Sequence, residues 1–389
     1  MPCPLLYGWL LHEIQLNGFG FTEFDMRSSV TIKDVALHAK LSTATVTRVI
    51  QQRGYVAEET REQVLAAIRD TGYRVNTLAQ ALRQQRTMTL GHMLHCISPN
   101  PFFARVALGV EREAHRHGYS VLLYNVEGDI EQERQGVETF LNRRVDGIIF
   151  TTAIDPTNVQ LAVSNHVPVV QVERVTSVET HAVLIDNYVG STEAVEHLIG
   201  LGHRHIAYIG ADPDHYRKNG QPTTYRQIEE QRLAGYVDTL GRHGLPIDQR
   251  YIALGQYYSL EDGGFAGDGA MFTEQFLQLQ TRPTAIFATC DILAAGVLQS
   301  LYRHGLSVPE DMSVVGYDNT YAPYLTPPLT TVEQPMLEIG GTAARILIET
   351  QTEWHAHAAI GNVRWEQRQL TTYLNCRSST GPPPADCGR

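Results

Sequence analysis

Apolar residues recur at helical spacing in two short segments near the beginning of the chain. The positions are Ile32, Val35, Ala36 and Ala39 in the first segment and Val46, Val49 and Ile50 in the second. Intervals of three and four residues place such side chains on one face of a helix. The pattern therefore predicts two short amphipathic helices, separated by Lys40 and Leu41. Periodicity alone is equally typical of any small pair of packed helices.

Polar residues mark where these helices begin. Thr31 precedes the first helix with Asp34 three residues later, which is a variant of the capping box. Ser42 can cap the second helix. The face of that helix opposite its apolar residues carries Thr43, Ala44, Thr47 and Arg48. Two short helices with a small polar tip on the second are typical of a helix-turn-helix, whose second helix enters the DNA major groove.

Residues 58–70 predict a third helix that closes this small head. Val64, Leu65 and Ile68 are expected to face inward, and Gly72 ends the helix. Ala57 stands at the position before the helix and offers no side-chain cap. A head of about sixty residues has a small core and is marginally stable by itself.

From Thr89 onward, short apolar runs alternate with amphipathic helices. The runs predicted as strands are 90–97, 120–124, 147–150, 167–170, 181–185, 205–210, 251–254, 285–289 and 313–317. The predicted helices between them are 103–117, 131–142, 191–201, 229–243, 271–280 and 292–304. Such alternation indicates parallel sheets covered by helices, here as two Rossmann-like lobes. Ligands of open α/β sheets bind beyond the carboxyl ends of the strands, so we expect a binding site between the lobes.

Composition narrows the class of protein. A chain of 389 residues is longer than a domain with a single hydrophobic core usually is, so two or three domains are expected. An apolar content of 43% and a charged content of 19% are ordinary for a soluble globular protein. The five cysteines are scattered without metal-ligand spacing, and no apolar run is long enough to cross a bilayer. We therefore expect a reduced, cytoplasmic protein.

A net charge of −11 is unfavourable for binding a nucleic acid, but the charges are unevenly distributed along the chain. Between residues 30 and 87 there are nine Lys and Arg against five Asp and Glu. This excess of four positive charges leaves an excess of fifteen negative charges on the rest of the chain. A basic head on an acidic body suits contact with phosphates and a nucleoid-associated protein.

The head also resembles a known family. V-T-I-K-D-V-A at 30–36 and S-T-A-T-V-T-R-V-I at 42–50 resemble the DNA-binding head of the LacI/GalR family of bacterial regulators. The family pattern runs T-I-x-D-V-A-x-x-A-x-V-S-x-x-T-V-S-R-V-L-N, and the chain departs from it mildly at Leu41, Thr47, Ile50 and Gln51. Further matching stretches are 76–83, 100–103, 144–147, 186–187, 201–204, 315–318 and 329–332. The resemblance therefore extends from about residue 30 to residue 378.

The resemblance implies a helix-turn-helix head at 30–75, a hinge helix and linker at 76–87, and an effector-binding and dimerisation domain at 88–378. That domain resembles type I periplasmic binding proteins. Its N-lobe is expected at 88–186 and 333–355, and its C-lobe at 187–332 and 356–378. Residues 1–29 are expected to be an extension that is either disordered or the product of a mis-assigned start, with Met26 as the natural start. The proline-containing residues 379–389 are expected to be a disordered tail.

The resemblance implies which residues meet DNA. Thr43 and Ala44 occupy the sequence-selecting positions, where their methyl groups suit the thymine methyl. Arg48 can bind a guanine in bidentate fashion, although a phosphate contact is the alternative. Asn76, Ala79 and Leu82 match the hinge pattern N-x-x-A-x-x-L, with Leu82 as a minor-groove wedge or, alternatively, a linker residue packed on the body. The remaining expected phosphate contacts are Thr31, Ser42, Thr45, Thr47 and Tyr55.

The resemblance likewise implies residues that bind an effector. Asp318 and Arg232 can grip hydroxyl groups or a carboxylate through paired, charge-assisted bonds. Asp291 can serve the same purpose or merely cap a helix, and Cys290 replaces the usual Asn. The complete expected set is Phe102, Phe103, Glu173, Arg174, Arg232, Tyr258, Cys290, Asp291 and Asp318.

The sequence gives little support for catalysis. It lacks a Walker A motif, a G-x-G-x-x-G after a strand and a G-x-S-x-G, and its paired histidines have no third ligand nearby. We therefore predict no catalytic residue, cofactor or metal, and no enzyme. The expected function is a sequence-specific transcriptional regulator, principally a repressor. It would bind pseudo-palindromic operator DNA as a homodimer and respond to a small molecule, expected to be a carbohydrate. The alternative is a sugar or small-solute binding protein without a DNA-dependent role.

Overall fold

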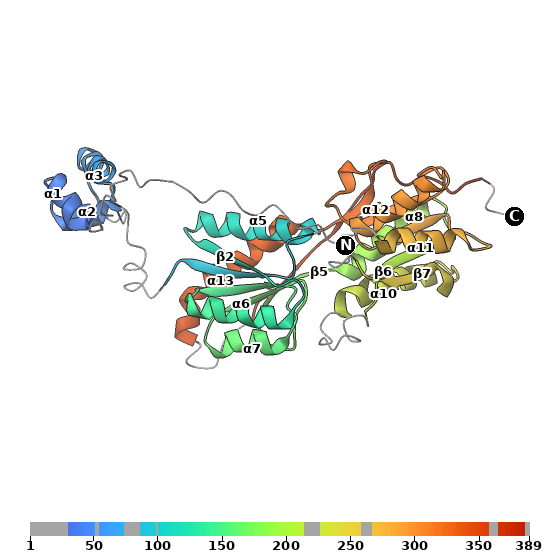
Figure 1. Cartoon of the computed structure of the whole chain (residues 1–389), viewed down its shortest axis with the longest axis horizontal. Helices are drawn as coiled ribbons and strands as arrows, with labels where there is room; N and C mark the ends of the chain where they lie inside the picture. The colour runs from blue at the N-terminus through green and yellow to red at the C-terminus, as the bar shows by residue number, and fades with distance from the viewer. Residues whose placement is uncertain are drawn as a thin grey trace, which may run out of the picture. The chain divides into compact units, whose positions relative to one another are not determined.

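A computed structural model describes residues 30–50, 54–73, 86–98, 100–213, 226–257, 267–357 and 365–385 (Figure 1). The chain divides into two compact units, Met1–Gln80 and Ala81–Arg389. The predicted hinge segment 76–83, the expected extension 1–29 and the last four residues lie outside the described residues. Among the described residues, no helix combines the length and the apolarity that crossing a bilayer requires.

The first unit holds three helices, α1 (Ile32–His38), α2 (Thr43–Ile50) and α3 (Glu58–Thr71). The predicted cap of α1 is confirmed, because the amide nitrogen and the Oγ1 of Thr31 both donate to Asp34 Oδ2 at 2.7 Å. Ser42 Oγ accepts a hydrogen bond from Thr45 N at 3.1 Å and caps α2. Gly72 ends α3 with a φ of 65°, a left-handed conformation that suits glycine.

The core of this unit consists of small side chains on the facing sides of the three helices. Its buried members are Val35, Ala36, Ala39, Val46, Val49, Val64 and Ala67. One prediction is wrong: Leu65 does not face inward but is 42% exposed. Ala67 takes the inward position instead, because it lies three residues after Val64 on the same side of α3.

The first lobe of the second unit is a six-stranded parallel sheet in the order β11-β5-β4-β3-β1-β2. Its strands are β1 (Thr89–Leu94), β2 (Ser120–Asn125), β3 (Gly147–Thr151), β4 (Val169–Val172), β5 (His181–Ile185) and β11 (Gln367–Leu370). Its helices are α5 (Pro101–Arg116), α6 (Ile130–Asn142), α7 (Pro156–Ser164) and α13 (Met336–His357). One apolar cluster joins the sheet to α5 and α13, and a second joins its other face to α6 and α7 (Figure 1).

The second lobe repeats this arrangement in the order β12-β10-β9-β8-β6-β7. Its strands are β6 (Ile206–Ala211), β7 (Ile252–Gly255), β8 (Ala285–Ala288), β9 (Ser313–Asp318), β10 (Thr330–Glu333) and β12 (Tyr373–Asn375). Only the pairing of β12 with β10 is antiparallel among these described strands. Helices α8 (Asn187–Gly200) and α10 (Arg226–Arg242) cover one face, and α11 (Gly267–Leu277) and α12 (Asp291–Arg303) cover the other.

The chain passes between the lobes after β5, after β10 and between β11 and β12. The third crossing corrects the predicted boundary at residue 355, because β11 pairs with β5 and belongs to the first lobe. The residues of β11 are mostly exposed and polar, so no apolar run marks this strand in the sequence. Its position is set by the backbone edge that β5 offers.

The beginning of the predicted disordered tail is also corrected. Ser379 is buried; its hydroxyl donates to Val314 O at 2.6 Å and accepts from Thr330 N at 2.8 Å. Two residues later, Gly381 N donates to Ser313 Oγ at 3.0 Å. These bonds fasten residues 379–381 to the second lobe, a pairing between distant residues that a proline-rich composition does not reveal.

Candidate DNA-reading surface and ligand cleft

Helix α2 presents one side to the head's core and the other side to solvent. Val46 and Val49 are buried, whereas Thr43, Ala44 and Arg48 are exposed. The charged and small side chains that the sequence places on the reading face are therefore open to a partner. A contact between these residues and DNA remains a prediction.

Some hydroxyl groups of the head already make hydrogen bonds within the protein. Thr47 Oγ1 donates to Thr43 O at 2.7 Å, and the hydroxyls of Ser42 and Thr45 lie 2.9 Å apart. Tyr55, by contrast, is 95% exposed, whereas Thr31 is exposed but donates its Oγ1 to Asp34. The other three residues expected at the DNA, Asn76, Ala79 and Leu82, lie outside the described part of the chain.

A cavity of about 50 Å³ lies between the two lobes of the second unit. Its lining residues are His95, Asn100, Phe102, Phe103, Thr152, Glu173, Arg174, Ile228, Arg232, Tyr257, Cys290, Asp318 and Gln334. Thr152 follows β3, Glu173 follows β4, and Asp318 ends β9, so the cavity sits beyond the carboxyl ends of the strands in both lobes. The place agrees with the position that the sequence predicts for a ligand.

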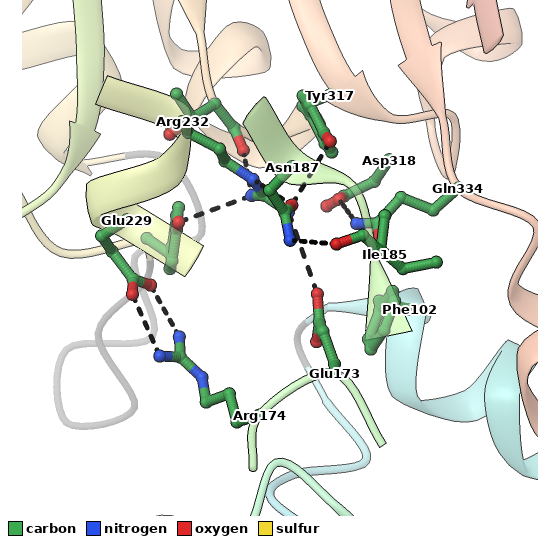
Figure 2. A network of polar contacts seen from close by, with 12 residues as sticks. Phe102, Glu173, Arg174, Ile185, Asn187, Glu229, Arg232, Tyr317, Asp318 and Gln334 are labelled. Carbon is green, nitrogen blue, oxygen red and sulfur yellow. Dashed lines mark hydrogen bonds and ion pairs between the residues drawn. The ribbon is translucent and has the colours of Figure 1, made fainter. Parts of the chain in front are cut away.

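Arg232 of α10 is the central cation of this site (Figure 2). Its Nε donates to Asn187 Oδ1 at 2.9 Å, and its Nη1 donates to Thr289 O at 2.8 Å. The guanidinium carbon lies 3.9 Å from the centre of the Tyr317 ring, and Nη2 lies 3.9 Å from Glu173 Oε1. Because Arg232 is only 3% exposed, these contacts hold its charge in one orientation.

A second ion pair joins the lobes. Arg174, which follows β4 of the first lobe, donates from Nη1 and Nη2 to the two carboxylate oxygens of Glu229 on α10, at 3.0 and 2.6 Å (Figure 2). Both side chains are buried. Glu229 is not among the residues predicted from the sequence to bind the effector. Glu229 lies three residues before Arg232, so both lie on one side of a helix. This spacing could have identified Glu229 from the sequence.

Asp318 and Glu173 are buried acids in strained backbone conformations. Asp318 has a φ of 105° and Glu173 a φ of 67°, values that are rare for residues with side chains and often occur at binding sites. Asp318 accepts hydrogen bonds from Gln334 Nε2 at 2.7 Å and from Asn100 Nδ2 at 3.5 Å. Burial raises the pKa of Asp318 to about 8 and also raises the pKa of Glu173.

Aromatic rings form the first-lobe side of the cavity. Phe102 and Phe103, at the beginning of α5, meet edge to face at 5.3 Å, and His95 lies 5.8 Å from Phe103. Burial and the nearby charge of Arg174 lower the pKa of His95 to about 4, so this ring is neutral at pH 7. Of the expected aromatic residues, Tyr258 lies outside the described residues, while its neighbour Tyr257 lines the cavity.

Asp291 neither lines the cavity nor caps a helix, the two roles predicted from the sequence. The N-cap of α12 is Cys290, whose Sγ accepts from Leu293 N at 3.5 Å. Asp291 Oδ2 accepts from the backbone amides of Thr320 at 2.6 Å, Tyr321 at 3.2 Å and Ala322 at 3.3 Å, and Oδ1 accepts from Thr331 Oγ1 at 2.7 Å. Its carboxylate therefore positions the loop after β9, and Cys290 rather than Asp291 lines the cavity.

Comparison with known proteins gives a consistent result for both units. Residues 31–76 match the family described as bacterial regulatory proteins, lacI family, and residues 195–378 match a periplasmic binding protein-like domain. The chain is 36% identical to the ribose operon repressor of Escherichia coli (strain K12), over 90% of this chain and 99% of that protein. It is 33% identical to the transcriptional repressor CytR of the same strain, over 84% of this chain and 92% of that protein.

Solved structures show the same architecture. The lac repressor dimer bound to operator and the anti-inducer ONPF matches with a TM-score of 0.72 and 26% identity, covering 90% of this chain and 99% of that chain. A complex of the transcriptional regulator CelR with cellobiose matches with a TM-score of 0.64 and 28% identity, with the same coverage.

Proposed function

The chain belongs to the LacI family of bacterial regulatory proteins, and on this premise we propose that it is a transcriptional repressor whose hold on operator DNA depends on a small molecule in the cleft. The observation that carries the proposal is the pairing, in one chain, of an exposed polar face on α2 with a buried polar cavity between two lobes. Neither feature alone separates a regulator from a general DNA-binding or solute-binding protein.

The DNA side of the proposal rests on α2. Thr43 and Ala44 lie in its first turn and Arg48 in its last, all on the exposed side, which suits a helix that enters the major groove by its N-terminal end. Arg48 is proposed to bind a guanine, and Thr43 and Ala44 to contact thymine methyl groups. Thr31, Ser42, Thr45, Thr47 and Tyr55 are proposed to hold the phosphates.

The ligand side rests on the chemistry of the cavity. Buried carboxylate, guanidinium and amide groups beside two phenylalanine rings suit a small ligand that has both hydroxyl groups and an apolar face. A carbohydrate has this character, and the CelR–cellobiose complex and the ribose operon repressor make it the natural class. At about 50 Å³, the cavity is far below the roughly 300 Å³ of a small ligand site, so we infer that the lobes must separate to admit the ligand.

The contacts across the cleft indicate how binding reaches the DNA. A ligand that enters must replace the bonds that now join Arg174 to Glu229 and Asp318 to Asn100, so the lobes are held differently with and without it. Asp146 of the first lobe accepts from Thr87 N at 2.8 Å and from Met88 N at 2.9 Å. It thereby fixes the segment that comes from the head, and a shift of this lobe is passed to that segment.

The remaining parts of the proposal follow the relatives. The chain would act in the cytoplasm as a homodimer on a pseudo-palindromic operator, and it would have no catalytic role. The structure of the lac repressor dimer bound to operator supports the dimer and its DNA partner. A solute-binding protein without a DNA-dependent role is the competing function. The basic head with its exposed α2 favours the regulator.

The test is a DNA-binding measurement with the purified full-length protein. Duplexes covering the promoter region of its own gene are compared with scrambled duplexes of equal length over a range of salt concentrations. We expect one duplex to bind at least about a thousandfold more tightly than the scrambled set at physiological salt. Equal, strongly salt-sensitive binding to every duplex would contradict the proposal.

A further inference from the structure

A second cavity lies at the end of the first lobe that faces away from the ligand cleft. Its volume is about 280 Å³, and its lining includes Arg144, Asp146, Asn165, His166, Pro168 and Gln351. Asp146 and Pro168 directly precede β3 and β4, so this cavity sits at the amino ends of the strands, whereas the ligand cleft sits at their carboxyl ends (Figure 1). We call this cavity the base groove, and it shares no lining residue with the ligand cleft.

The segment that comes from the head is fastened beside the base groove. Asp146 accepts from Thr87 N at 2.8 Å and from Met88 N at 2.9 Å, and Thr87 Oγ1 donates to Arg144 O at 2.9 Å. Twelve residues, 74–85, lie between the described part of the head and the segment that begins at residue 86. Fully extended, such a connection spans on the order of 45 Å, little more than the roughly 34–36 Å of one turn of DNA. The base groove is therefore confined to the neighbourhood of any duplex that the head binds.

The base groove carries positive charge in an acidic part of the chain. Arg143 and Arg144 are exposed, and neither has a carboxylate partner among the residues that the structure describes. Asp146 is the acid in the lining, and its carboxylate already accepts from the backbone amides at residues 87 and 88. Burial and Asp146 raise the pKa of Tyr119 while Arg86 lowers it, so a third guanidinium group lies near this point. The arrangement suits an anionic partner.

The backbone at the base groove also singles out its cations. Arg144 follows α6 with a φ of 54°, and His166 follows α7 with a φ of 59°, both in the left-handed region. Glycine is the usual residue at this position after a helix. After α5, α8, α10 and α12 the corresponding residues are Gly118, Gly202, Gly244 and Gly305, with φ values between 66° and 103°. The two turns that form the base groove thus carry cations at a conformational cost, which is typical of residues kept for function.

Capping of the helices does not require these side chains. A cation near a helix C-terminus is often explained by the carbonyl groups that the helix leaves without partners. At the end of α6, however, Val145 N donates to Phe140 O at 3.2 Å, and at the end of α7, Val167 N donates to Ala162 O at 3.2 Å. Because the backbone closes both helices, the exposed guanidinium groups remain available to a partner.

We propose that the base groove is a second DNA-binding surface, in which Arg143, Arg144 and His166 hold backbone phosphates outside the head. This inference rests on the proposed function and extends it from the head to the first lobe. Guanidinium groups bind phosphate oxygens without reading bases, so the contact adds affinity but no sequence preference. A ligand that shifts the first lobe would weaken this contact together with the hold on the linker.

The test is the salt dependence of DNA binding by the full-length protein. Wild type, Arg144→Gly and Arg143→Gln/Arg144→Gly are titrated on operator and scrambled duplexes between about 50 and 200 mM salt, where each phosphate contact adds about 0.9 to the slope of log K against log salt. In a homodimer each substitution occurs twice, so we expect the slope to fall by about 1.8 for the single and about 3.6 for the double variant on both duplexes. The preference for operator over scrambled DNA should not change. Glycine suits the φ of 54° at position 144, so the variant should fold.

The second lobe offers a matched control. A cavity of about 390 Å³ lies at the amino ends of its strands, and its lining includes His205, Arg282 and Asp311. Arg282 is exposed like Arg144, but the segment from the head is fastened to the other lobe. Arg282→Gln removes the same charge from the same unit and should keep the slope of the wild type.

The outcomes separate this inference from the proposed function. A double variant with native circular dichroism and the slope of the wild type overturns the inference, as does an equal loss of slope in Arg282→Gln. It is also overturned if inorganic phosphate, compared with sodium chloride of equal ionic strength, raises Tm of the wild type but not of the double variant while their slopes agree. In that case the base groove binds a free anion rather than DNA. A wild type that binds operator and scrambled duplexes equally would instead contradict the proposed function, and the slopes would still report on the base groove.

Discussion

The head and the cleft hold their arginines in opposite ways. Arg48 is exposed on α2, whereas Arg232 is 3% exposed and is fixed by Asn187, Thr289 and the Tyr317 ring. DNA can recruit Arg48 without breaking a hydrogen bond to any residue that the structure describes, but a ligand in the cleft must exchange bonds that already exist. Charged residues in the head should therefore govern affinity for DNA, and those in the cleft should govern both stability and response.

The two regions also differ in what supports them. The buried core of the head is made only of Val and Ala among the described residues, while each lobe has an apolar cluster on both faces of its sheet. Because its core is small, the head has a low free energy of unfolding, and the loss of one helix cap removes a large fraction of it. The lobes can carry buried charges because their larger cores offset the cost.

The largest effect is expected from Arg232→Ala. The change removes the cation beside Glu173 and Asp318 and the bonds to Asn187 and Thr289, so we expect about 3–5 kcal/mol lower free energy of unfolding. Urea unfolding measures it, with Arg105→Ala as control, because Arg105 makes an exposed bond to Asn319 O that is worth less than about 1 kcal/mol. Equal free energies of unfolding for the two variants would show that the buried arginine of the cleft stabilises the fold no more than an exposed arginine does.

A pH effect of about 3 kcal/mol is expected from Glu133, a buried acid on α6. Burial raises the pKa of Glu133 to about 7, and the carboxylate accepts from the amides of Ile154 and Asp155. The folded-state pKa lies above the ordinary value of 4.5, so the folded protein binds this proton more tightly than the unfolded chain does. The resulting contribution to the free energy of unfolding is therefore full below pH 4.5 and is lost as the pH rises through 7. Glu133→Gln should flatten the fall in unfolding free energy between pH 5 and pH 8. If the unfolding free energy of Glu133→Gln falls with pH as steeply as that of the wild type, Glu133 is not the cause of the fall.

An effect of about 1–3 kcal/mol on operator affinity, with none on stability, is expected from Arg48→Ala. Loss of a bidentate contact should relax the preference at one base pair. Arg69→Ala, an exposed change of equal charge on α3, is the control for the general electrostatic loss. If both variants lose the same affinity for operator and scrambled DNA, Arg48 reads no base and contacts a phosphate.

The smallest effect is expected at the cap of α2. Ser42→Ala leaves Thr45 N without its acceptor and should lower the stability of the head by about 1 kcal/mol, whereas Ser42→Gly should cost only a few tenths. Amide hydrogen exchange in the absence of DNA measures it and excludes any effect through a phosphate contact. Identical protection in wild type and Ser42→Ala would show that the cap is dispensable.

The parts of the fold that sequence could predict are those with a strong periodic pattern. The apolar stripes of α1 and α2, their caps at Thr31 and Ser42, and the central buried strands all follow from local spacing. The strand β11 and the fastening of Ser379 do not, because each depends on backbone partners about 65 to 185 residues away along the chain.

The site was predicted unevenly for the same reason. Arg232 and Asp318 were identified by resemblance, and the cavity brings them together. Glu229 was missed although its helical spacing to Arg232 was visible, because its partner Arg174 lies 55 residues earlier and in the other lobe. Asp291 was assigned to the ligand or to a cap, and only the folded loop at 320–322 reveals what its carboxylate holds.

The most direct test of the account is reciprocity between the two sites. The affinity for operator is measured across a titration with a neutral sugar that calorimetry shows to bind, and the affinity for that sugar is then measured on operator-saturated protein. We expect both affinities to change by the same factor, about 5- to 150-fold, since the two sites share one coupling free energy. An operator affinity that stays constant while the cleft becomes saturated would contradict the claim that the cleft controls the head.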